Sequence, residues 1–269
     1  MLRLILQRRC AFEHSRRAFS SLGARWQSQE EMRTPSKSTL DKLYDTHVPT
    51  TTIEKAALAV KAGFAALFDP TRQDMVAALG ETTAGGIFLS RLRDQMLSDT
   101  TSRRVLRERP VVNSQTINLD RLRQLPDGTF GREYVRFMDE EGISPDTRTK
   151  VHYVDNEELA YVMRRYRETH DFTHTLTGLP ITVEGEIALK WFELTQTGLP
   201  MTLMSSLIGP LRLSQQELSR LFQHYVPWAV ECGSACKPLL CVYFEERMEQ
   251  NIEELRKELG IWLPPSLQH

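Results

Sequence analysis

The chain has 269 residues, of which 41% are apolar, and its formal net charge at pH 7 is −1. This length and apolar content are sufficient for one sizeable hydrophobic core, and we expect a single structured domain. No uninterrupted apolar run reaches the roughly 18 to 20 residues that a membrane-spanning helix needs. The composition therefore argues against a transmembrane helix, and we expect a soluble or peripheral protein.

Positive charge is concentrated at the start of the chain. Residues 1–25 contain six arginines and a single acid, with Leu, Phe and Ser between them. This pattern is typical of a mitochondrial transit peptide, and the alternative is a disordered basic arm. Cleavage after Phe19 would change the formal net charge from −1 to −5, which argues against nucleic-acid binding. Because 20–46 is a polar stretch typical of a tether, we assign 1–46 to a transit peptide and tether and 47–265 to one helical domain.

Helix signals dominate the rest of the chain. Thr51 or Thr52 can cap a helix that ends at Asp69-Pro70, and Gly and Pro separate the later segments. The predicted helices cover 53–68, 71–80, 86–97, 131–139, 155–176, 182–197, 199–208, 214–231 and 241–259. The sequence of residues 103–120 instead predicts an extended connection or an edge hairpin. The sequence therefore predicts an all-α fold: a single-domain helical bundle with a mostly irregular connection around 103–120.

The predicted 155–176 helix has an apolar face and a charged face. Its apolar stripe at helical spacing consists of Leu159, Val162, Met163 and Tyr166. His170 and His174 extend this stripe by successive turns, so we expect both imidazoles to face inward. On the other side we predict a solvated flank that consists of Arg164, Arg165, Arg167 and Glu168.

Two imidazoles and two carboxylates lie close together in one predicted helical hairpin. His170 and His174 are one turn apart on the same face of the 155–176 helix, and Asp171 sits beside them. Glu186 follows a Thr-Gly-Leu-Pro break, on a helix that returns roughly antiparallel. Two His with one or two carboxylates suit Zn²⁺, or another divalent metal that accepts nitrogen and oxygen ligands. We predict that this cluster binds a metal; the alternative is that the histidines are hydrogen-bonded core residues.

Three familiar metal patterns fit these residues less well. A zincin protease has Glu after the first His, where this chain has the shorter Asp171. A di-iron bundle needs a second Glu-x-x-His copy, and an HD-type phosphohydrolase needs an Asp further along the chain; neither is present. On the 182–197 helix, Glu186, Lys190 and Glu193 form a polar strip. If this strip faces the histidines it completes the site, with Glu193 as a reserve ligand; if it faces solvent it is an ordinary ion-paired edge.

Two further features concern thiols and lipid. Cys232, Cys236 and Cys241 do not have the C-x-x-C spacing of a zinc knuckle, and we expect them to be free thiols. The apolar segments 56–68 and 199–211 are either core helices or surfaces that touch lipid. The second, rich in Met and Leu, could also line a groove for a long apolar ligand.

Several separate motifs, in order and spacing, are similar to one known family. They are Asp69–Thr83, Leu92–Met96, Gly131–Phe137, Ser144–Arg148, the His-Asp-x-x-His run at 170–174, and Lys190–Glu193 with Gln196–Met201. Together they resemble the mitochondrial ubiquinone (coenzyme Q) biosynthesis protein Coq-four family, over about residues 47–265. That family's signature, His-Asp-x-x-His followed after eleven residues by Glu, falls without departure on His170, Asp171, His174 and Glu186.

The resemblance implies a metal-dependent lyase that removes the C1 carboxylate of a 4-hydroxy-3-methoxy-5-polyprenylbenzoate during ubiquinone biosynthesis. It implies Zn²⁺ bound by the four signature residues, and among them Asp171 or Glu186 could exchange with substrate or shuttle a proton. It also implies a peripheral protein on the matrix side of the mitochondrial inner membrane, in a multisubunit complex with other coenzyme Q biosynthesis proteins and a polyprenylated aromatic lipid. A homodimer is compatible with this expectation, and nucleic acid is not an expected partner.

Two roles stay open at the level of sequence. A lyase needs an open metal position, whereas a non-catalytic lipid-binding scaffold of the same complex would have a structural zinc with four protein ligands. In the first matched motif, Arg72, Asp74 and Glu81 either bind the substrate head group or cap and pair helices.

Overall fold

The structure is a computed structural model, and it describes residues 42–69 and 72–265. The predicted transit peptide and most of the predicted tether lie outside the described residues. Residues 42–46 contact the helical part of the chain: the Tyr44 hydroxyl donates to the carbonyl of Val154 at 3.0 Å, and the Thr46 hydroxyl donates to that of Val151 at 2.6 Å.

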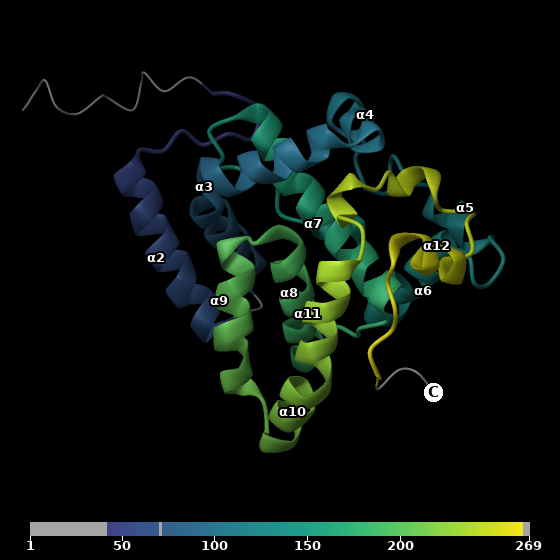
Figure 1. Ribbon diagram of the computed structural model, residues 1–269. Helices are drawn as coiled ribbons and strands as arrows, with labels where there is room; N and C mark the ends of the chain where they lie inside the picture. Colours follow the sequence, from purple (N-terminus) through teal and green to yellow (C-terminus); the bar gives the residue numbers. More distant parts are fainter. Residues whose placement is uncertain (1–41, 70–71, 266–269) are drawn as a thin grey trace, which may run out of the picture. The chain divides into compact units, whose positions relative to one another are not determined.

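The described residues form α-helices, short 3₁₀ turns and one π-helical turn, with a single isolated β-bridge and no strand, so the predicted all-α fold is confirmed. The helices are α2 (Thr52–Phe68), α3 (Gln73–Ser98), α4 (Thr100–Glu108), α5 (Leu119–Arg123), α6 (Phe130–Glu141), α7 (Glu157–Thr177), α8 (Val183–Thr197), α9 (Pro200–Ile208), α10 (Gln215–Arg220), α11 (Val226–Ala235) and α12 (Ile252–Leu259). In Figure 1, α8, α9 and α11 lie beside one another, with α2 beyond α9. None of the helices in the described ranges combines the length and apolar character that crossing a bilayer requires.

Helix α7 belongs to both large hydrophobic clusters of the described domain. Its first half, which includes the predicted stripe, packs with α3 and α4. Its second half contributes Phe172 and Leu176 to the cluster built by α6, α8, α11 and α12. The predicted stripe is buried, as expected. The two histidines therefore lie on a helix that is fixed on several sides.

The predicted solvated flank of α7 is wrong for three of its four residues, since only Arg164 is substantially exposed and Arg167 pairs with the buried Glu81. The Arg165 side chain is 0% exposed and pairs with Glu245, while its guanidinium also donates to the carbonyl of Val242 at 2.9 Å. Glu168 is buried and accepts from Arg164 at 2.8 Å. Arg165 is buried because the 239–246 segment, about 80 positions away in the chain, packs over this side of α7.

The predicted 241–259 helix is α-helical only in its last eight residues. Only Ile252–Leu259 is α-helical, and 3₁₀ turns occupy Leu239–Cys241 and Phe244–Glu246. Carbonyls at 248 and 250 accept from the backbone N–H groups of Gly131 and Phe130 at 2.8 Å. These bonds to α6 use backbone groups that a continuous helix would have needed for itself.

The predicted irregular connection at 103–120 is shorter than expected. Residues 103–108 belong to α4, because the Asp99 carboxylate caps the Ser102 N–H at 2.9 Å and Val105 and Leu106 are buried. This helix ends at Arg109, whose φ of +47 lies in the left-handed region. The irregular connection is therefore confined to 109–118.

Helices α8 and α11 approach so closely that the contact tolerates only glycine at position 233. A Cβ added there would overlap the Thr195 hydroxyl and lie 2.9 Å from the Phe192 carbonyl. We expect Gly233→Ala to lower the free energy of unfolding by about 1 to 3 kcal/mol. Gly63→Ala in α2, whose Cβ would lie 3.7 Å from Leu79, is the matched control and should raise it by roughly 0.5 to 1 kcal/mol. Urea unfolding measures both; an unchanged Gly233→Ala variant would contradict the packing described.

A candidate metal centre between α7 and α8

The hairpin that connects α7 to α8 sets two histidines opposite a glutamate. Helix α7 ends at Gly178, whose φ of +69 favours glycine and whose N–H donates to the His174 carbonyl at 2.8 Å. Thr182 caps α8 through the Gly185 N–H at 3.1 Å. A side chain at 185 would overlap the Pro180 carbonyl, so glycine permits the tight return. Glu186 thereby lies in the first turn of α8, facing the last turns of α7.

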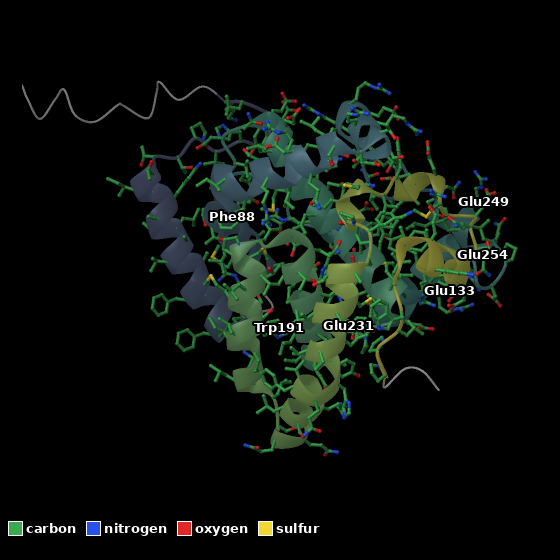
Figure 2. The ribbon with its side chains drawn as sticks, in the orientation of Figure 1. Phe88, Glu133, Trp191, Glu231, Glu249 and Glu254 are labelled. Carbon is green, nitrogen blue, oxygen red and sulfur yellow. The ribbon has the colours of Figure 1, made fainter. Side chains whose placement is uncertain are left out.

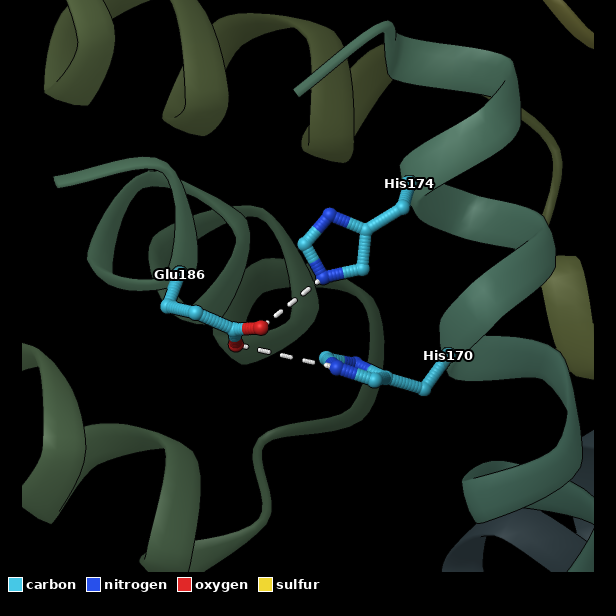
Figure 3. A group of neighbouring side chains, drawn as sticks. All are labelled: His170, His174 and Glu186. Carbon is cyan, nitrogen blue, oxygen red and sulfur yellow. Dashed lines mark hydrogen bonds and ion pairs between the residues drawn. The ribbon is translucent and has the colours of Figure 1, made fainter. Parts of the chain in front are cut away.

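Three ligand atoms converge at this point (Figure 3). His174 Nε2 lies 3.2 Å from Glu186 Oε1, and His170 Nε2 lies 3.7 Å from Glu186 Oε2. One nitrogen of each histidine and one oxygen of the glutamate all fall within 4.8 Å of one another. The His174 side chain is 1% exposed, whereas that of Glu186 is 33% exposed, so the group is closed on the His174 side and accessible from the Glu186 side.

Hydrogen bonds on the far side of each ring set the direction of the histidine lone pairs. His174 Nδ1 lies 2.8 Å from the Leu179 carbonyl, which can only accept, so this nitrogen carries the proton. His170 Nδ1 lies 2.7 Å from Glu193 Oε1 and donates to it for the same reason. In the neutral rings both Nε2 lone pairs then point toward the carboxylate of Glu186. Three electron-pair donors that face one another need a cation between them, either a proton or a metal ion.

Glu193 orients His170 and has no remaining role as a ligand. Its carboxylate accepts from His170 Nδ1, from Lys190 Nζ at 2.7 Å and from the Tyr166 hydroxyl at 2.7 Å. A histidine that donates its second ring nitrogen to a carboxylate is the usual outer-shell arrangement of zinc sites. Glu193, the predicted reserve ligand, thus contacts His170 at Nδ1 and not at Nε2, the nitrogen that faces Glu186. The predicted polar strip of α8 faces α7 and not solvent.

Asp171 stays outside the group of three. Its Oδ2 accepts from the Nε of Arg148 at 3.1 Å and from Nη2 of the same side chain. Arg148 is fixed in turn, because its Nη1 donates to the carbonyl of Val112 at 2.9 Å and to that of Pro145 at 3.2 Å. The structure therefore brings together three of the four predicted ligands.

Charges around the group shift the pKa values of its acids and bases. Burial raises the pKa of Glu186, but the hydrogen bond from His174 and the positive charges of His170 and Lys190 lower it overall to about 2. Burial opposes ionisation of Glu193 as well, and the charge of Lys190 with that of His170 holds its pKa well below the usual range. For His170, burial and Lys190 lower the pKa, yet Glu193 and Glu186 leave it raised. Both carboxylates are ionised at neutral pH.

We expect acid to destabilise the metal-free protein through these two carboxylates. Because the folded-state pKa values of Glu186 and Glu193 lie below the unfolded values, their stabilising effect is complete above about pH 4.3 and is lost as the pH falls toward 2. His170 acts in the opposite sense, with a stabilising effect that is present below about pH 6.5 and lost as the pH rises.

Urea unfolding of the metal-free protein between about pH 6 and pH 3 measures the acid effect. The control is the double variant Lys190→Met with Glu193→Gln, which lacks one of the two carboxylates and should lose less stability over this range. An identical pH slope in the two proteins would contradict the assignment to Glu193.

Other matched residues make structural contacts. Glu81 accepts from the N–H groups of His152 at 2.8 Å and Tyr153 at 2.6 Å and pairs with Arg167, so it joins α3 to α7. Arg72 and Asp74 pair with each other at the exposed start of α3. Arg72, Asp74 and Glu81 thus make the kind of pairing contacts that were predicted as the alternative to binding the substrate head group. The three cysteines in the described ranges are free thiols, as predicted.

Sequence reasoning missed several residues that hold the site. The partners of Asp171 and Glu193, and the Phe137 ring that stacks on His174 with centroids 5.3 Å apart, were not predicted. The sequence does contain a signal for Tyr166, because this residue lies one helical turn before His170 on the same apolar stripe. Phe137 and Arg148 are the last residues of two motifs matched to the family, but helical spacing does not connect them with the site, because they come from α6 and from the irregular segment before α7.

Comparison with known proteins decides which family this fold and site represent. The family model described as "Coenzyme Q (ubiquinone) biosynthesis protein Coq4" matches residues 44–265. The chain belongs to the Coq4 family. The expected family resemblance is thereby confirmed, and with it a role in ubiquinone biosynthesis.

Relatives named mitochondrial ubiquinone biosynthesis protein COQ4 match most of the chain. The protein of Laccaria bicolor is 54% identical over 222 residues, which cover 82% of this chain and 74% of that protein. The protein of Yarrowia lipolytica is 50% identical over 237 residues, which cover 88% and 90%. A crystal structure from Nostoc punctiforme shares the fold, with a TM-score of 0.62 and 24% identity, and covers 76% of this chain and 97% of that chain.

Proposed function

We propose that this Coq4 protein is a metal-dependent carboxy-lyase that removes the C1 carboxylate of 4-hydroxy-3-methoxy-5-polyprenylbenzoate. Membership of a ubiquinone biosynthesis family supports the pathway. The observation that carries the chemistry is the convergence of two imidazole lone pairs and one carboxylate on a common point, accessible from one side. This donor set suits Zn²⁺ or another divalent metal with mixed nitrogen and oxygen ligands.

The residues around this point are arranged to receive an anion. When bound, a divalent cation would act as a Lewis acid and, with Glu186 as its anionic ligand, would retain positive charge for an aromatic carboxylate. The charges of Lys190 and Glu193 compensate each other, as do those of Arg148 and Asp171. Glu186 is exposed enough to meet substrate, and its ionised carboxylate can orient a water molecule beside C1.

In the proposed reaction, C1 of the ring gains a proton and the bond from C1 to the carboxylate carbon breaks. The electron pair of that bond returns to the ring, and carbon dioxide leaves. Hydrogen bonds at Nδ1 fix the orientation of the His170 and His174 rings, so that their Nε2 atoms would hold the metal ion while the reaction proceeds. Solvent water supplies the proton for C1; Glu186, which is ionised at neutral pH, can accept a hydrogen bond from this water and orient it, whereas Asp171, the other predicted catalytic residue, faces Arg148.

The test follows carbon dioxide and the aromatic product by mass spectrometry when the Zn²⁺-loaded full chain is incubated with a prenylated 4-hydroxy-3-methoxybenzoate and lipid vesicles. Metal-dependent product that is absent from folded Glu186→Gln supports the lyase. Bound metal without product, also in the presence of the other coenzyme Q biosynthesis proteins, would overturn it in favour of a scaffold with a structural zinc.

We also propose that the protein is a peripheral member of a multisubunit complex on the matrix side of the mitochondrial inner membrane. An exposed apolar surface of α2 and the α9 region supports this location. It consists of Ile53, Val60, Phe64, Phe68, Leu203, Leu207 and Leu211. Met204 of α9 packs beside Ala62 and Leu79, which keeps the two helices adjacent. In Figure 2 the outer edge of α2 carries mostly carbon, whereas the opposite edge, near Glu249 and Glu254, carries many polar atoms.

We expect the double variant Phe64→Ser with Phe68→Ser to bind phosphatidylcholine vesicles that contain an anionic lipid at least about tenfold more weakly, since burial of one Phe contributes about 1.5 to 3 kcal/mol. Both side chains are more than half exposed, so the fold should tolerate the change. Vesicle flotation measures the bound fraction. Val230→Ser, at an exposed apolar position on α11, is the matched control; an equal effect of the two variants would contradict this surface.

A further inference from the structure

A small cavity lies between α3, α7, α8 and the turn at 238–240. Its volume is about 20 Å³, and a cavity needs roughly 10 to 15 Å³ to hold one water molecule. Most of its lining residues are buried, and the half-buried ones are Gln95, Gln196 and Pro238. The cavity is therefore large enough for one small molecule, and its contact with solvent is limited to the side of these three residues.

Hydroxyl oxygens from α7 give the cavity a polar wall. Thr169 donates its hydroxyl hydrogen to the Tyr166 carbonyl at 3.1 Å, and Thr173 donates its own to the Thr169 carbonyl at 2.9 Å. The Tyr166 hydroxyl donates to Glu193 at 2.7 Å. Because each of these hydrogens is in use, all of these hydroxyl oxygens can only accept a hydrogen bond from a molecule in the cavity.

Glu193 adds a further acceptor to the wall. Its carboxylate accepts from His170, Lys190 and Tyr166, and an ionised carboxylate has about four acceptor positions, so it can accept from one more donor. Of the lining residues that the structure describes, only Glu193 is charged, and Lys190 Nζ, 2.7 Å away, balances its charge. A cation or an anion in the cavity would therefore lack a counter-charge, and a neutral molecule fits the wall better.

The half-buried side of the cavity contains two amides. Gln196 is fixed there by its own hydrogen bonds. Its Nε2 donates to the Gly233 carbonyl and, at 3.3 Å, to Cys236 Sγ. Its Oε1 accepts from the Leu239 N–H at 3.0 Å. Gln95, which lines the cavity from α3, has an amide that can donate to a molecule inside.

We propose that this cavity is a binding site for one internal water molecule. The water donates one hydrogen to Glu193 or the Tyr166 hydroxyl and the other to the hydroxyl oxygen of Thr169 or Thr173, and it accepts from Gln95. Internal waters typically make about three such hydrogen bonds. An apolar molecule would leave the acceptors without partners. The water joins α3 to the hydrogen-bond network of Glu193, and the inference depends neither on a metal nor on the proposed lyase activity.

The direct test is a crystal structure of the full chain at a resolution that shows ordered water, with a second crystal kept under xenon pressure. We expect one water peak in the cavity, within hydrogen-bond distance of Glu193 or the Tyr166 hydroxyl and of Thr169 or Thr173, and no xenon there. Dry apolar cavities accept xenon, whereas polar ones hold water. A xenon peak, a cavity without a peak, or a water that lacks these contacts would overturn the inference.

Thermal unfolding of three Thr→Val variants tests the site in solution. Thr169→Val and Thr173→Val alter the cavity wall. Thr177→Val is the matched control, because its buried hydroxyl likewise donates to a carbonyl one turn earlier, that of Thr173 at 2.7 Å, but does not line the cavity.

We expect at least one of the two wall variants to have a Tm about 2 °C or more below that of Thr177→Val, because the internal water loses a partner. Val has nearly the shape of Thr, so the fold should tolerate all three changes. Tm values of both wall variants equal to or above that of Thr177→Val would indicate a dry cavity and overturn the inference.

Discussion

Replacement of Glu193 by Gln is expected to weaken Zn²⁺ binding by about 10- to 100-fold, the range found when an outer-shell partner of a ligating histidine is lost. Glu193 accepts the Nδ1 proton of His170 and so determines that Nε2 is the unprotonated nitrogen. Gln can offer a neutral oxygen in the same place, but it withdraws the negative charge that makes the imidazole a stronger ligand. Competition with a chromophoric chelator measures the change.

The same variant should also be less stable. The Lys190 ammonium lies 2.7 Å from Glu193 and is largely buried, so removal of the carboxylate leaves a shielded positive charge without its ion-pair partner. Breaking a buried pair from one side costs about 3 to 5 kcal/mol. Equilibrium unfolding of the metal-free protein measures this loss separately from metal binding.

The double variant Lys190→Met with Glu193→Gln distinguishes the two effects. It removes both charges, so we expect it to recover most of the stability while Zn²⁺ binding stays weak. Recovery of metal affinity together with stability would show that Glu193 acts only on the fold, and would contradict its role in orienting His170.

Replacement of His174 by Ala is expected to have the largest effect on metal binding. Structural zinc in zinc-finger peptides is bound with about 10 to 16 kcal/mol in total. On this scale, loss of one of few ligands should cost roughly 3 to 4 kcal/mol, or about 100- to 1,000-fold in affinity. His174 also fills a fully enclosed position between Phe137 and the Leu179 carbonyl. The variant should therefore lose thermal stability as well.

Phe137→Leu is the matched control for His174→Ala. It removes the ring that stacks on the imidazole but leaves the Nδ1 bond to Leu179 and the Nε2 direction intact. We expect it to change Zn²⁺ affinity by less than about tenfold. A Phe137→Leu variant that loses metal as completely as His174→Ala would mean that packing of the ring, and not ligation by Nε2, accounts for the effect.

The sequence predicted the parts of the site that depend on local spacing. His170 and His174 share a helix face by periodicity, and the Thr-Gly-Leu-Pro break returns the chain so that Glu186 faces them. The sequence did not determine whether the polar strip of α8 faces the histidines or solvent. In the structure it faces α7. The hydrogen-bond network behind His170 follows from that direction, but only the structure could supply it.

The residues that the sequence placed wrongly are those whose partners are distant in the chain. Arg165 was expected in solvent, yet it is buried because Glu245, 80 positions away, supplies a counter-charge. Asp171 lies where helix spacing puts it, but Arg148, from the irregular segment before α7, determines which way its carboxylate points. Helical periodicity describes which face a residue occupies and contains no information about such partners.

Errors in the element boundaries have a similar cause. The pattern at 241–251 is compatible with a helix, but its backbone carbonyls bond to the start of α6 instead. Arg109-Pro110 and the Val-Val-Asn-Ser-Gln-Thr-Ile-Asn run that follows suggested an extended chain from 103 onward, but the Asp99 cap and the burial of Val105 and Leu106 keep 103–108 helical. Tertiary packing decided both cases.

The most direct measurement is the anomalous scattering of a crystal of the Zn²⁺-loaded protein, recorded on both sides of the zinc absorption edge. The account predicts a single strong peak about 2.0 to 2.2 Å from His170 Nε2, His174 Nε2 and an oxygen of Glu186. A protein without zinc at this point, or with the peak elsewhere, would contradict it.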